Sequence, residues 1–272
     1  MPELPEVETI KRDLVAKILG AQVIDIKPYD PSFLKRQKID FQDLFSLKGQ
    51  ILDKIDRFGK YLFFSFKEKF LILHLGLTGA LILDEKNKDT HLLMNHLILS
   101  FEFKQYLLHL RDIRKFGKLF IIGKEEREKF LNSVAEDALE ISYESFKRKI
   151  SLYKGPLKSF FLNQKFVSGL GNIYTDELLF RAKLSPFKKG FELTEEDIKT
   201  LFKIMKELLQ EAIKLRGSSI RDYVDGMGQP GRFQERHLVY GKKGLPCPFC
   251  GTPLFYTKLN QRGTTYCPNC QK

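Results

Sequence analysis

The chain has 272 residues, of which 43% are hydrophobic and 29% charged, an ordinary globular composition long enough for two packed domains. Its 46 Lys and Arg residues against 34 Asp and Glu residues give a net charge of +12, which favours nucleic acid or another polyanionic partner, or serves solubility alone. No uninterrupted apolar stretch of about 18 residues is present, which excludes a membrane-spanning helix. The first residues lack the basic and apolar regions of a secretory signal. We therefore expect a cytoplasmic protein without a membrane partner.

The first 123 residues predict one helix followed by many short strands. Apolar side chains at helical spacing, from Val7 to Ile18, predict a helix over 5–19 that begins at Pro5. Short β-rich runs separated by charged or glycine-containing turns predict strands over 22–27, 61–66, 70–74, 80–83, 96–103, 106–110 and 118–122. Evenly spaced short strands are typical of a sandwich or a barrel.

After Gly123 the pattern becomes helical. The last of its helices is the clearest, because Thr194 can cap it, Asp197 follows three residues later, and the apolar residues form one continuous stripe. Glycine and polar residues over 216–236 then predict a mobile loop. The helices are predicted over 143–152, 158–161, 175–182 and 194–215.

Four cysteines, all within the last 26 residues, have the spacing of a zinc ribbon. Cys247 and Cys250 form one Cys-x-x-Cys pair, Cys267 and Cys270 form the second, and 16 residues separate the pairs. Two such turns aim four thiolates at one point and leave no open coordination position, which is typical of a structural site. We therefore predict one structural Zn²⁺, with a redox dithiol and unligated thiols as the alternatives.

Removal of Met1 would leave Pro2 with the free amino group of the chain. An α-amino group titrates near pH ~8, so an uncharged fraction can attack an electrophilic sugar carbon and form a Schiff base. A helix that begins near Pro5 would lower the pKa of this amine and favour the carboxylate forms of Glu3 and Glu6, which could move protons. The same residues also fit a frayed terminus with ordinary helix-start chemistry.

Six segments, in this order along the chain, resemble those of the bacterial formamidopyrimidine-DNA glycosylases. They are MPELPEVET (1–9), HLGLTG (74–79), DIRKFG (112–117), GLGNIY (169–174), VYGKKGLPC (239–247) and QRGTTYCPNCQK (261–272). The resemblance covers the chain from end to end, and the two terminal motifs together are highly specific. It implies a bacterial, nucleoid-associated protein whose partner is double-stranded DNA containing an oxidised base, and we expect a monomer by default.

The resemblance implies an α+β multidomain fold. An N-terminal catalytic β-sandwich flanked by helices would cover 1–124, and an interdomain linker would cover 125–138. A helical domain with a helix–two-turn–helix motif would cover 139–236 and carry a loop, 217–232, that closes over the lesion. A four-cysteine zinc ribbon would cover 237–272.

The resemblance also implies the reaction, which is base excision followed by strand cleavage. The damaged purine, 8-oxoguanine or a formamidopyrimidine, is flipped out of the duplex. Pro2 displaces the base through a Schiff base, and β- and δ-elimination follow. Glu3 matches the acid/base residue, and Glu6 matches a supporting carboxylate in the lesion pocket. The residues of the 217–232 loop expected to read the base are Ser218, Ser219 and Tyr223.

Further residues match the family's contacts with DNA. Lys60, which we count with the catalytic residues, matches a lysine that binds a phosphate beside the lesion, and His91 matches a DNA-binding position. Asn172 and Arg262 match two more phosphate ligands. Without the resemblance, Lys60 fits a surface lysine, Asn172 a helix cap and Arg262 a solvated turn.

Leu77, Arg114 and Phe116 match the side chains that enter the duplex when the base leaves. An apolar wedge fills the space, and an arginine can hydrogen-bond the orphaned base. Lys115, between the last two, is also expected to bind DNA. Leu77 stands where methionine is common, Ile113 where proline is common, and Lys115 and Lys242 where arginine is common. Lysine keeps the charge but loses bidentate geometry, which affects positioning rather than the reaction.

Two other functions fit parts of the pattern. An endonuclease VIII-like enzyme for oxidised pyrimidines would share Pro2, Glu3 and the ribbon, although Leu4 favours the purine branch. A non-catalytic nucleic-acid-binding protein with a zinc ribbon would need the basic surface but not a free Pro2 amine.

Overall fold

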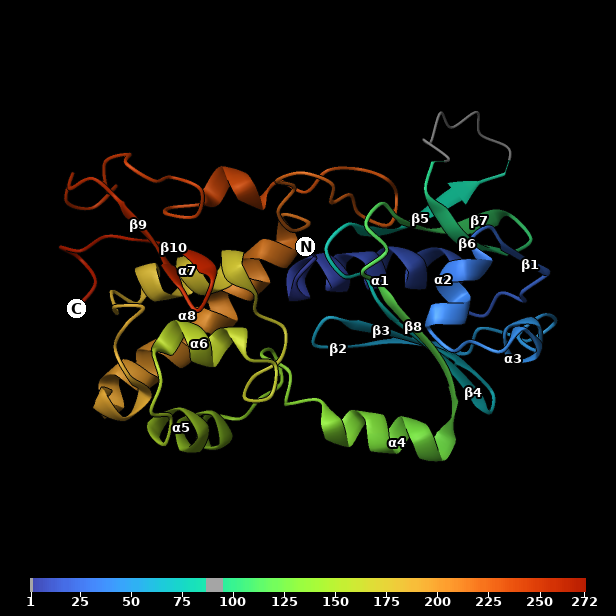
Figure 1. Cartoon of the computed structure of the whole chain (residues 1–272), viewed down its shortest axis with the longest axis horizontal. Coiled ribbons are helices and arrows are strands. Elements are labelled where there is room, and N and C mark those ends of the chain that lie inside the picture. Colours follow the sequence, from blue (N-terminus) through green and yellow to red (C-terminus); the bar gives the residue numbers. More distant parts are fainter. Residues whose placement is uncertain (1, 87–94) are drawn as a thin grey trace. The chain divides into compact units, whose positions relative to one another are not determined.

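The computed structural model describes residues 2–86 and 95–272, and the chain divides into two compact units (Figure 1). The first unit contains Met1–Ser133 and Ile213–Gln234, and the second contains Val134–Ala212 and Glu235–Lys272. The 217–232 loop therefore belongs to the first unit, although the helix before it lies mostly in the second.

The first unit is built on two four-stranded antiparallel sheets, which confirms the predicted β-sandwich. Every second residue of several strands, such as Leu62, Phe64 and Phe66 on β3, belongs to one core that both sheets share with the first helix. One sheet has the order β1 (Asp25–Pro28), β6 (Leu97–Glu102), β7 (Tyr106–Asp112) and β5 (Gly79–Glu85). The other has the order β2 (Lys54–Phe58), β3 (Tyr61–Phe66), β4 (Lys69–His74) and β8 (Lys118–Gly123).

Helix α1 (Leu4–Ile18) buries the predicted apolar face. Val7, Ile10, Leu14 and Ile18 are almost fully buried in the core that the two sheets share, and Figure 1 shows the helix running beside β2 and β3. Glu6 accepts a hydrogen bond from the Glu3 backbone N–H at 2.8 Å, so the acidic first turn satisfies its own free donor.

Several short elements of the first unit differ from the prediction. The first strand begins at Asp25 rather than at residue 22, and β2 was not predicted. Two helices of six and five residues, α2 (Pro31–Arg36) and α3 (Phe41–Phe45), were also missed. Each begins at an aspartate N-cap, Asp30 or Asp40, but is too short to show a hydrophobic period. Helix α4 (Lys124–Ser133) occupies most of the expected linker.

The second unit is helical and ends in a small hairpin. Its helices are α5 (Tyr143–Ser151), α6 (Leu157–Leu162), α7 (Asn172–Arg181) and α8 (Glu195–Lys214), which continues to the first unit, with short 3₁₀ turns at Gly190–Glu192 and Phe233–Arg236. The Thr194 N–H donates to the Asp197 carboxylate at 3.0 Å, and the Asp197 N–H donates to the Thr194 hydroxyl at 3.1 Å. The two residues therefore form a reciprocal N-terminal cap of α8, as the sequence predicted for Thr194. Helix α7 begins at Asn172, earlier than the predicted residue 175, because the preceding glycine serves as its N-cap.

The hairpin of the second unit pairs β9 (Phe255–Leu259) with β10 (Arg262–Tyr266). Asn260 and Gln261 both have positive φ, 48° and 63°, as a two-residue type I′ turn requires. Among the described residues, no helix combines the length and the apolar character needed to cross a membrane.

Candidate functional site

The candidate catalytic residues gather at the start of α1. Pro2 and Glu3 precede the helix, and the Glu3 and Glu6 side chains are only 2% and 1% exposed. Both oxygens of Glu6 bind backbone N–H groups: Oε2 accepts from Glu3 at 2.8 Å, and Oε1 accepts from Ser218 at 2.7 Å. One carboxylate therefore fixes the residue beside Pro2 to the 217–232 loop.

Gly217 makes this approach possible. Its φ of +79° lies in the left-handed region, and a Cβ there would be 2.6 Å from Glu6 Oε1. A side chain at this position would meet the carboxylate itself, so only glycine brings the loop this close to α1.

The three predicted loop residues have different surroundings. Ser218 is buried, while Ser219 donates its hydroxyl to the Tyr223 carbonyl at 2.8 Å and accepts from Gly231 N–H at 2.9 Å. Tyr223 packs into the main core and is 8% exposed, and its hydroxyl donates to the Arg216 carbonyl at 3.1 Å. Burial first, and then the Glu6 charge, raise the pKa of Tyr223 well above its usual value. Its side chain thus anchors the loop.

Lys60 lies in the turn between β2 and β3 and is 6% exposed. Arg57 holds this turn, because its guanidinium donates to the Gly59 carbonyl at 2.9 Å and to Glu8 on α1 at 2.9 Å. Burial would raise the pKa of Glu8, but hydrogen bonds from Lys11, Arg57 and Arg12 lower it overall, so the carboxylate stays charged. The structure therefore brings the Lys60 turn and α1 together.

His74 is a candidate that sequence reasoning missed. Its Nδ1 accepts a hydrogen bond from Gly76 N–H at 3.1 Å, and its ring packs on Tyr61 with a centroid separation of 4.9 Å. Burial, together with the Lys60 and Lys118 charges, lowers the pKa of His74 to about 4. A neutral ring with Nε2–H as donor results. The only sign of His74 in the sequence is its place as the first residue of the HLGLTG segment. A single histidine at the end of a strand has no spacing pattern that would mark it as functional.

The wedge residues occupy two facing turns. Thr78 donates to Asp112 at 2.7 Å and accepts from the Arg114 N–H at 3.0 Å, while Asp112 also accepts from Gly117 N–H at 2.7 Å. These bonds bring the turn of Leu77 beside the turn of Arg114 and Phe116. Phe116 is 52% exposed, with the Arg114 guanidinium 4.7 Å from its ring centre.

Lys115 is exposed to solvent but forms an ion pair. Its ammonium lies 2.6 Å from Asp30, whose other oxygen caps α2 through Phe33 N–H at 2.9 Å. The Lys115 hydrogen bond, followed by that of Ser32, holds the pKa of Asp30 well below its ordinary value. His91, also predicted to bind DNA, lies outside the described residues.

In the second unit, Asn172 is the first residue of α7, and its buried Oδ1 has no hydrogen-bond partner among the described residues. Arg262 is exposed directly after the hairpin turn. A fully buried lysine supports the hairpin: Lys158 donates to Asp176 at 2.6 Å and to the Gly263 carbonyl at 2.5 Å. The residue beside Arg262 is thus fixed to α6 and α7.

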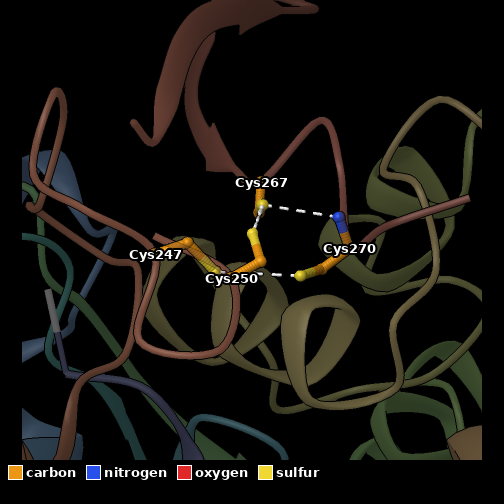
Figure 2. A group of neighbouring side chains, drawn as sticks. All are labelled: Cys247, Cys250, Cys267 and Cys270. Carbon is orange, nitrogen blue, oxygen red and sulfur yellow. Dashed lines mark hydrogen bonds between the residues drawn. The ribbon is translucent and has the colours of Figure 1, made fainter. Parts of the chain in front are cut away.

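The four cysteines converge as the spacing predicted (Figure 2). Their sulfur atoms lie within 4.8 Å of one another, with Cys247 to Cys270 at 3.8 Å and Cys250 to Cys267 at 3.5 Å. Tetrahedral Zn–S bonds of about 2.3 Å place neighbouring sulfurs about 3.8 Å apart. The site therefore fits a four-coordinate structural Zn²⁺.

Comparisons with known proteins match three consecutive regions of the chain. Residues 1–119 match the formamidopyrimidine-DNA glycosylase N-terminal domain, 134–224 match the formamidopyrimidine-DNA glycosylase H2TH domain, and 244–272 match the zinc finger found in FPG and IleRS. The formamidopyrimidine-DNA glycosylase of Pelotomaculum thermopropionicum is 36% identical over 100% of this chain and 99% of its own length. The chain belongs to the formamidopyrimidine-DNA glycosylase family.

Solved structures of the family have the same fold. A Lactococcus lactis Fpg variant in complex with DNA containing Fapy-dG superimposes with a TM-score of 0.90, at 35% identity and over 100% of both chains. The wild-type Lactococcus lactis Fpg in complex with DNA containing an oxidised pyrimidine gives a TM-score of 0.89 at 34% identity, again over 100% of both chains. The formamidopyrimidine-DNA glycosylase fold, with its helix–two-turn–helix region and four-cysteine finger, is therefore confirmed.

Proposed function

We propose that the chain is a bifunctional DNA glycosylase and AP lyase of base excision repair, acting on oxidised purines such as formamidopyrimidines in double-stranded DNA. The full-length family match supports the activity. The observation that carries the assignment to particular residues is the start of α1, where two buried carboxylates adjoin Pro2. The family relationship and the absence of a membrane-crossing helix among the described residues also suit a bacterial cytoplasmic enzyme associated with the nucleoid.

Pro2 is the nucleophile in this proposal. Removal of Met1 exposes a secondary amine with a pKa near ~8, lowered by the positive end of α1, so an uncharged fraction is available. The nitrogen attacks C1′ of the damaged nucleotide, the glycosidic bond breaks, and the base leaves with a proton. The C1′–O4′ bond then breaks as O4′ takes up a proton, which opens the sugar ring and gives an iminium. The iminium acidifies the C2′ proton, so β-elimination releases the 3′ phosphate ester and δ-elimination then releases the 5′ one.

Glu3 is the acid/base residue, because it directly follows Pro2 and its carboxylate can carry protons between sugar, base and water. Glu6 positions it, since Glu6 holds the Glu3 N–H and the Ser218 N–H at once. The backbone of Ser218 and Ser219 then faces the flipped base, while Tyr223 anchors the loop. Lys60, on the turn that Arg57 fixes to α1, binds the phosphate beside the lesion.

The remaining DNA contacts fall into two groups. Asn172, at a helix N-terminus, and Arg262, at a hairpin, bind phosphates of the same strand, with His91 as a further contact. Leu77, Arg114 and Phe116 enter the duplex from two turns that Asp112 and Thr78 hold together. The zinc supplies no chemistry to the reaction; when bound, it cross-links the two cysteine turns that carry the hairpin.

The domain boundaries follow from the same proposal. The catalytic domain would end near residue 124 and the linker near 138, with the ribbon beginning near 237. Within this scheme the 217–232 loop belongs to the helical domain, 139–236, but it packs in the first unit. The enzyme acts as a monomer.

Borohydride trapping tests the proposal. A duplex with a formamidopyrimidine or 8-oxoguanine opposite cytosine should give a covalent protein–DNA band, and mass spectrometry should place the adduct on Pro2. Pro2→Thr should lose trapping and strand cleavage but keep DNA binding, whereas Pro31→Thr, at an exposed helix start, should keep all three. Trapping that survives in Pro2→Thr would reject the proposed nucleophile.

Oxidised pyrimidines are the second substrate class to test, because the Lactococcus lactis relative has been crystallised with DNA that contains one. Trapping on an oxidised pyrimidine duplex but not on either purine duplex would favour the endonuclease VIII-like alternative. DNA binding without trapping on any lesion, with Met1 shown to be absent, would favour the non-catalytic one.

A further inference from the structure

An ionic cluster ties both ends of the segment 217–224 to α1. The Arg216 guanidinium donates from Nη2 to Asp13 Oδ2 at 2.6 Å and from Nε to Asp225 Oδ2 at 2.7 Å. Asp13 lies on the C-terminal half of α1, whereas Arg216 and Asp225 flank the segment 217–224. The Asp225 side chain is only 1% exposed and that of Asp13 is 11% exposed, whereas the Arg216 side chain is 44% exposed, so solvent reaches the cation but not the two carboxylates that it joins.

The two carboxylates also hold the loop backbone. Asp13 Oδ2 accepts from Gly226 N–H at 3.1 Å, and Asp225 Oδ1 accepts from Met227 and Gln229 N–H, both at 2.9 Å. The Gly226 carbonyl in turn accepts from Leu83 N–H on β5 at 2.8 Å. The ion pairs are therefore part of a hydrogen-bonded network that fixes the backbone after residue 224.

The cluster encloses the segment that the proposed function places against the lesion. Glu6 holds the start of the segment by accepting a hydrogen bond from Ser218 N–H. Tyr223 holds the end of the segment, because its hydroxyl donates to the Arg216 carbonyl. Between these anchors, Ile220, Arg221 and Asp222 remain exposed. The segment thus has fixed ends and an accessible middle.

We propose that Arg216, Asp13 and Asp225 are positioning residues that preorganise the 218–223 segment for the flipped base before DNA arrives. The inference rests on the proposed function, because it assumes that this segment contacts a base. A loop that is ordered in advance avoids the entropy cost of ordering it at each binding event, so more of the binding energy reaches the transition state. Arg216 bridges two carboxylates with separate nitrogen atoms, which lysine cannot do.

The discriminating experiment compares two substrates. A duplex with a formamidopyrimidine needs the segment, whereas an abasic duplex has no base for it to contact. Asp13→Asn and Asp225→Asn should lower single-turnover base excision about ten-fold, the effect of one charge-assisted hydrogen bond, and leave abasic-strand cleavage unchanged. Arg216→Lys should give a smaller loss. Asp25→Asn, which breaks an exposed ion pair with Lys48 in the same unit, is the matched control and should change neither rate.

Hydrogen exchange provides a readout independent of activity. The Gly226, Met227 and Gln229 amides should exchange about ten-fold faster in Asp13→Asn or Asp225→Asn, while amides in β3 and β4 keep their protection. Faster exchange with unchanged base excision would overturn the inference. Equal loss of both reactions would also overturn it, because the cluster would then be a general structural support. A wild-type enzyme inactive on both substrates would instead reject the proposed function.

Discussion

Buried carboxylates hold backbone segments in both units, but they serve different ends. In the first unit, Glu6 and Asp225 accept hydrogen bonds from backbone N–H groups of a glycine-rich loop whose residues 220–222 are exposed. In the second unit, Glu177 is fully buried and accepts from the N–H groups of residues 238–240, all at 2.9 Å, at the entrance to the ribbon. There the carboxylate fixes the start of the zinc ribbon, whose two cysteine turns a metal would cross-link. The same kind of hydrogen bond therefore holds a loop with an exposed middle in the first unit and the base of the ribbon in the second.

Removal of zinc should have the largest effect and should affect only the second unit. Chelation, or Cys267→Ser, should unfold the 244–272 segment, because structural zinc sites contribute on the order of 10 kcal/mol to folding. Amide exchange should rise across the hairpin while α1 and the two sheets keep their protection, and DNA binding should fall as Arg262 loses its support. Zinc added back after chelation should restore both; full protection of the hairpin without metal would contradict the prediction.

Lys158→Met should produce the next largest effect. It leaves Asp176 buried without its cation, which typically costs about 3–5 kcal/mol. Burial already raises the pKa of Asp176 to about 6, against the opposing effect of Lys158. Without the lysine this pKa rises further, so the loss of stability should be larger at pH 8 than at pH 5, where Asp176 binds a proton. Chemical denaturation at both pH values measures it.

Lys48→Met is the control for this prediction, since its partner Asp25 is exposed. No measurable change in the free energy of unfolding is expected for it. A Lys158→Met protein as stable as the wild type at pH 8 would show that the buried pair does not support the hairpin.

One histidine from each unit, the half-buried His74 and the buried His237, extends the comparison to pH. Burial, and then nearby Lys and Arg charges, lower the pKa of His74 and of His237 to about 4. Because the unfolded residue titrates near 6.5, the unfolded chain binds more protons between these values, and stability falls as the pH drops from about 6.5 to 4. Each histidine should contribute ~1–3 kcal/mol to this loss.

Unfolding at pH 7.5 and 4.5 measures the effect. His74→Gln should reduce the difference between the two pH values, and so should His237→Gln, whereas His96→Gln on an exposed turn should not. An unchanged difference in both His74→Gln and His237→Gln would contradict the stated cause.

The smallest effect should come from Lys115. Since Asp30 already pairs with it, Lys115→Met should leave the salt dependence of DNA binding almost unchanged, while Arg262→Met should reduce the slope of log K against log salt by about 0.9. Asp30→Asn should release the lysine to the phosphates and increase the slope. Equal reductions for Lys115→Met and Arg262→Met would identify Lys115 as a direct phosphate ligand.

The parts of the fold that the sequence predicted well depend on local patterns. The α1 face, the strands from β3 to β8 and the cysteine turns all follow from spacing within a few residues. Helices α2 and α3 were missed because five or six residues span too little of a helical period. Strand β2 was missed because Lys54, Asp56 and Arg57 mask its apolar positions.

The contacts that assemble the site lie beyond any local pattern. Glu6 meets Ser218 across 212 residues, and Asp13 meets Arg216 across 203. The sequence predicts Lys115 as a DNA contact but shows nothing of its ion pair with Asp30, because that partner lies in a distant helix cap. The family resemblance named the catalytic residues, but only the structure relates them to these supporting groups.

Gly217 limits how this region can vary. Substitution there meets two independent obstacles, the left-handed backbone and the Glu6 carboxylate. Gly241, Gly244 and Gly251 have similar φ values but no atom within 4 Å of a built Cβ, so asparagine could replace them at small cost. Substitution without loss of stability is therefore possible at these three glycines around the ribbon but not at Gly217 in the loop. A lineage could change residue 217 only after residue 6 had lost the carboxylate that holds the Glu3 and Ser218 N–H groups together.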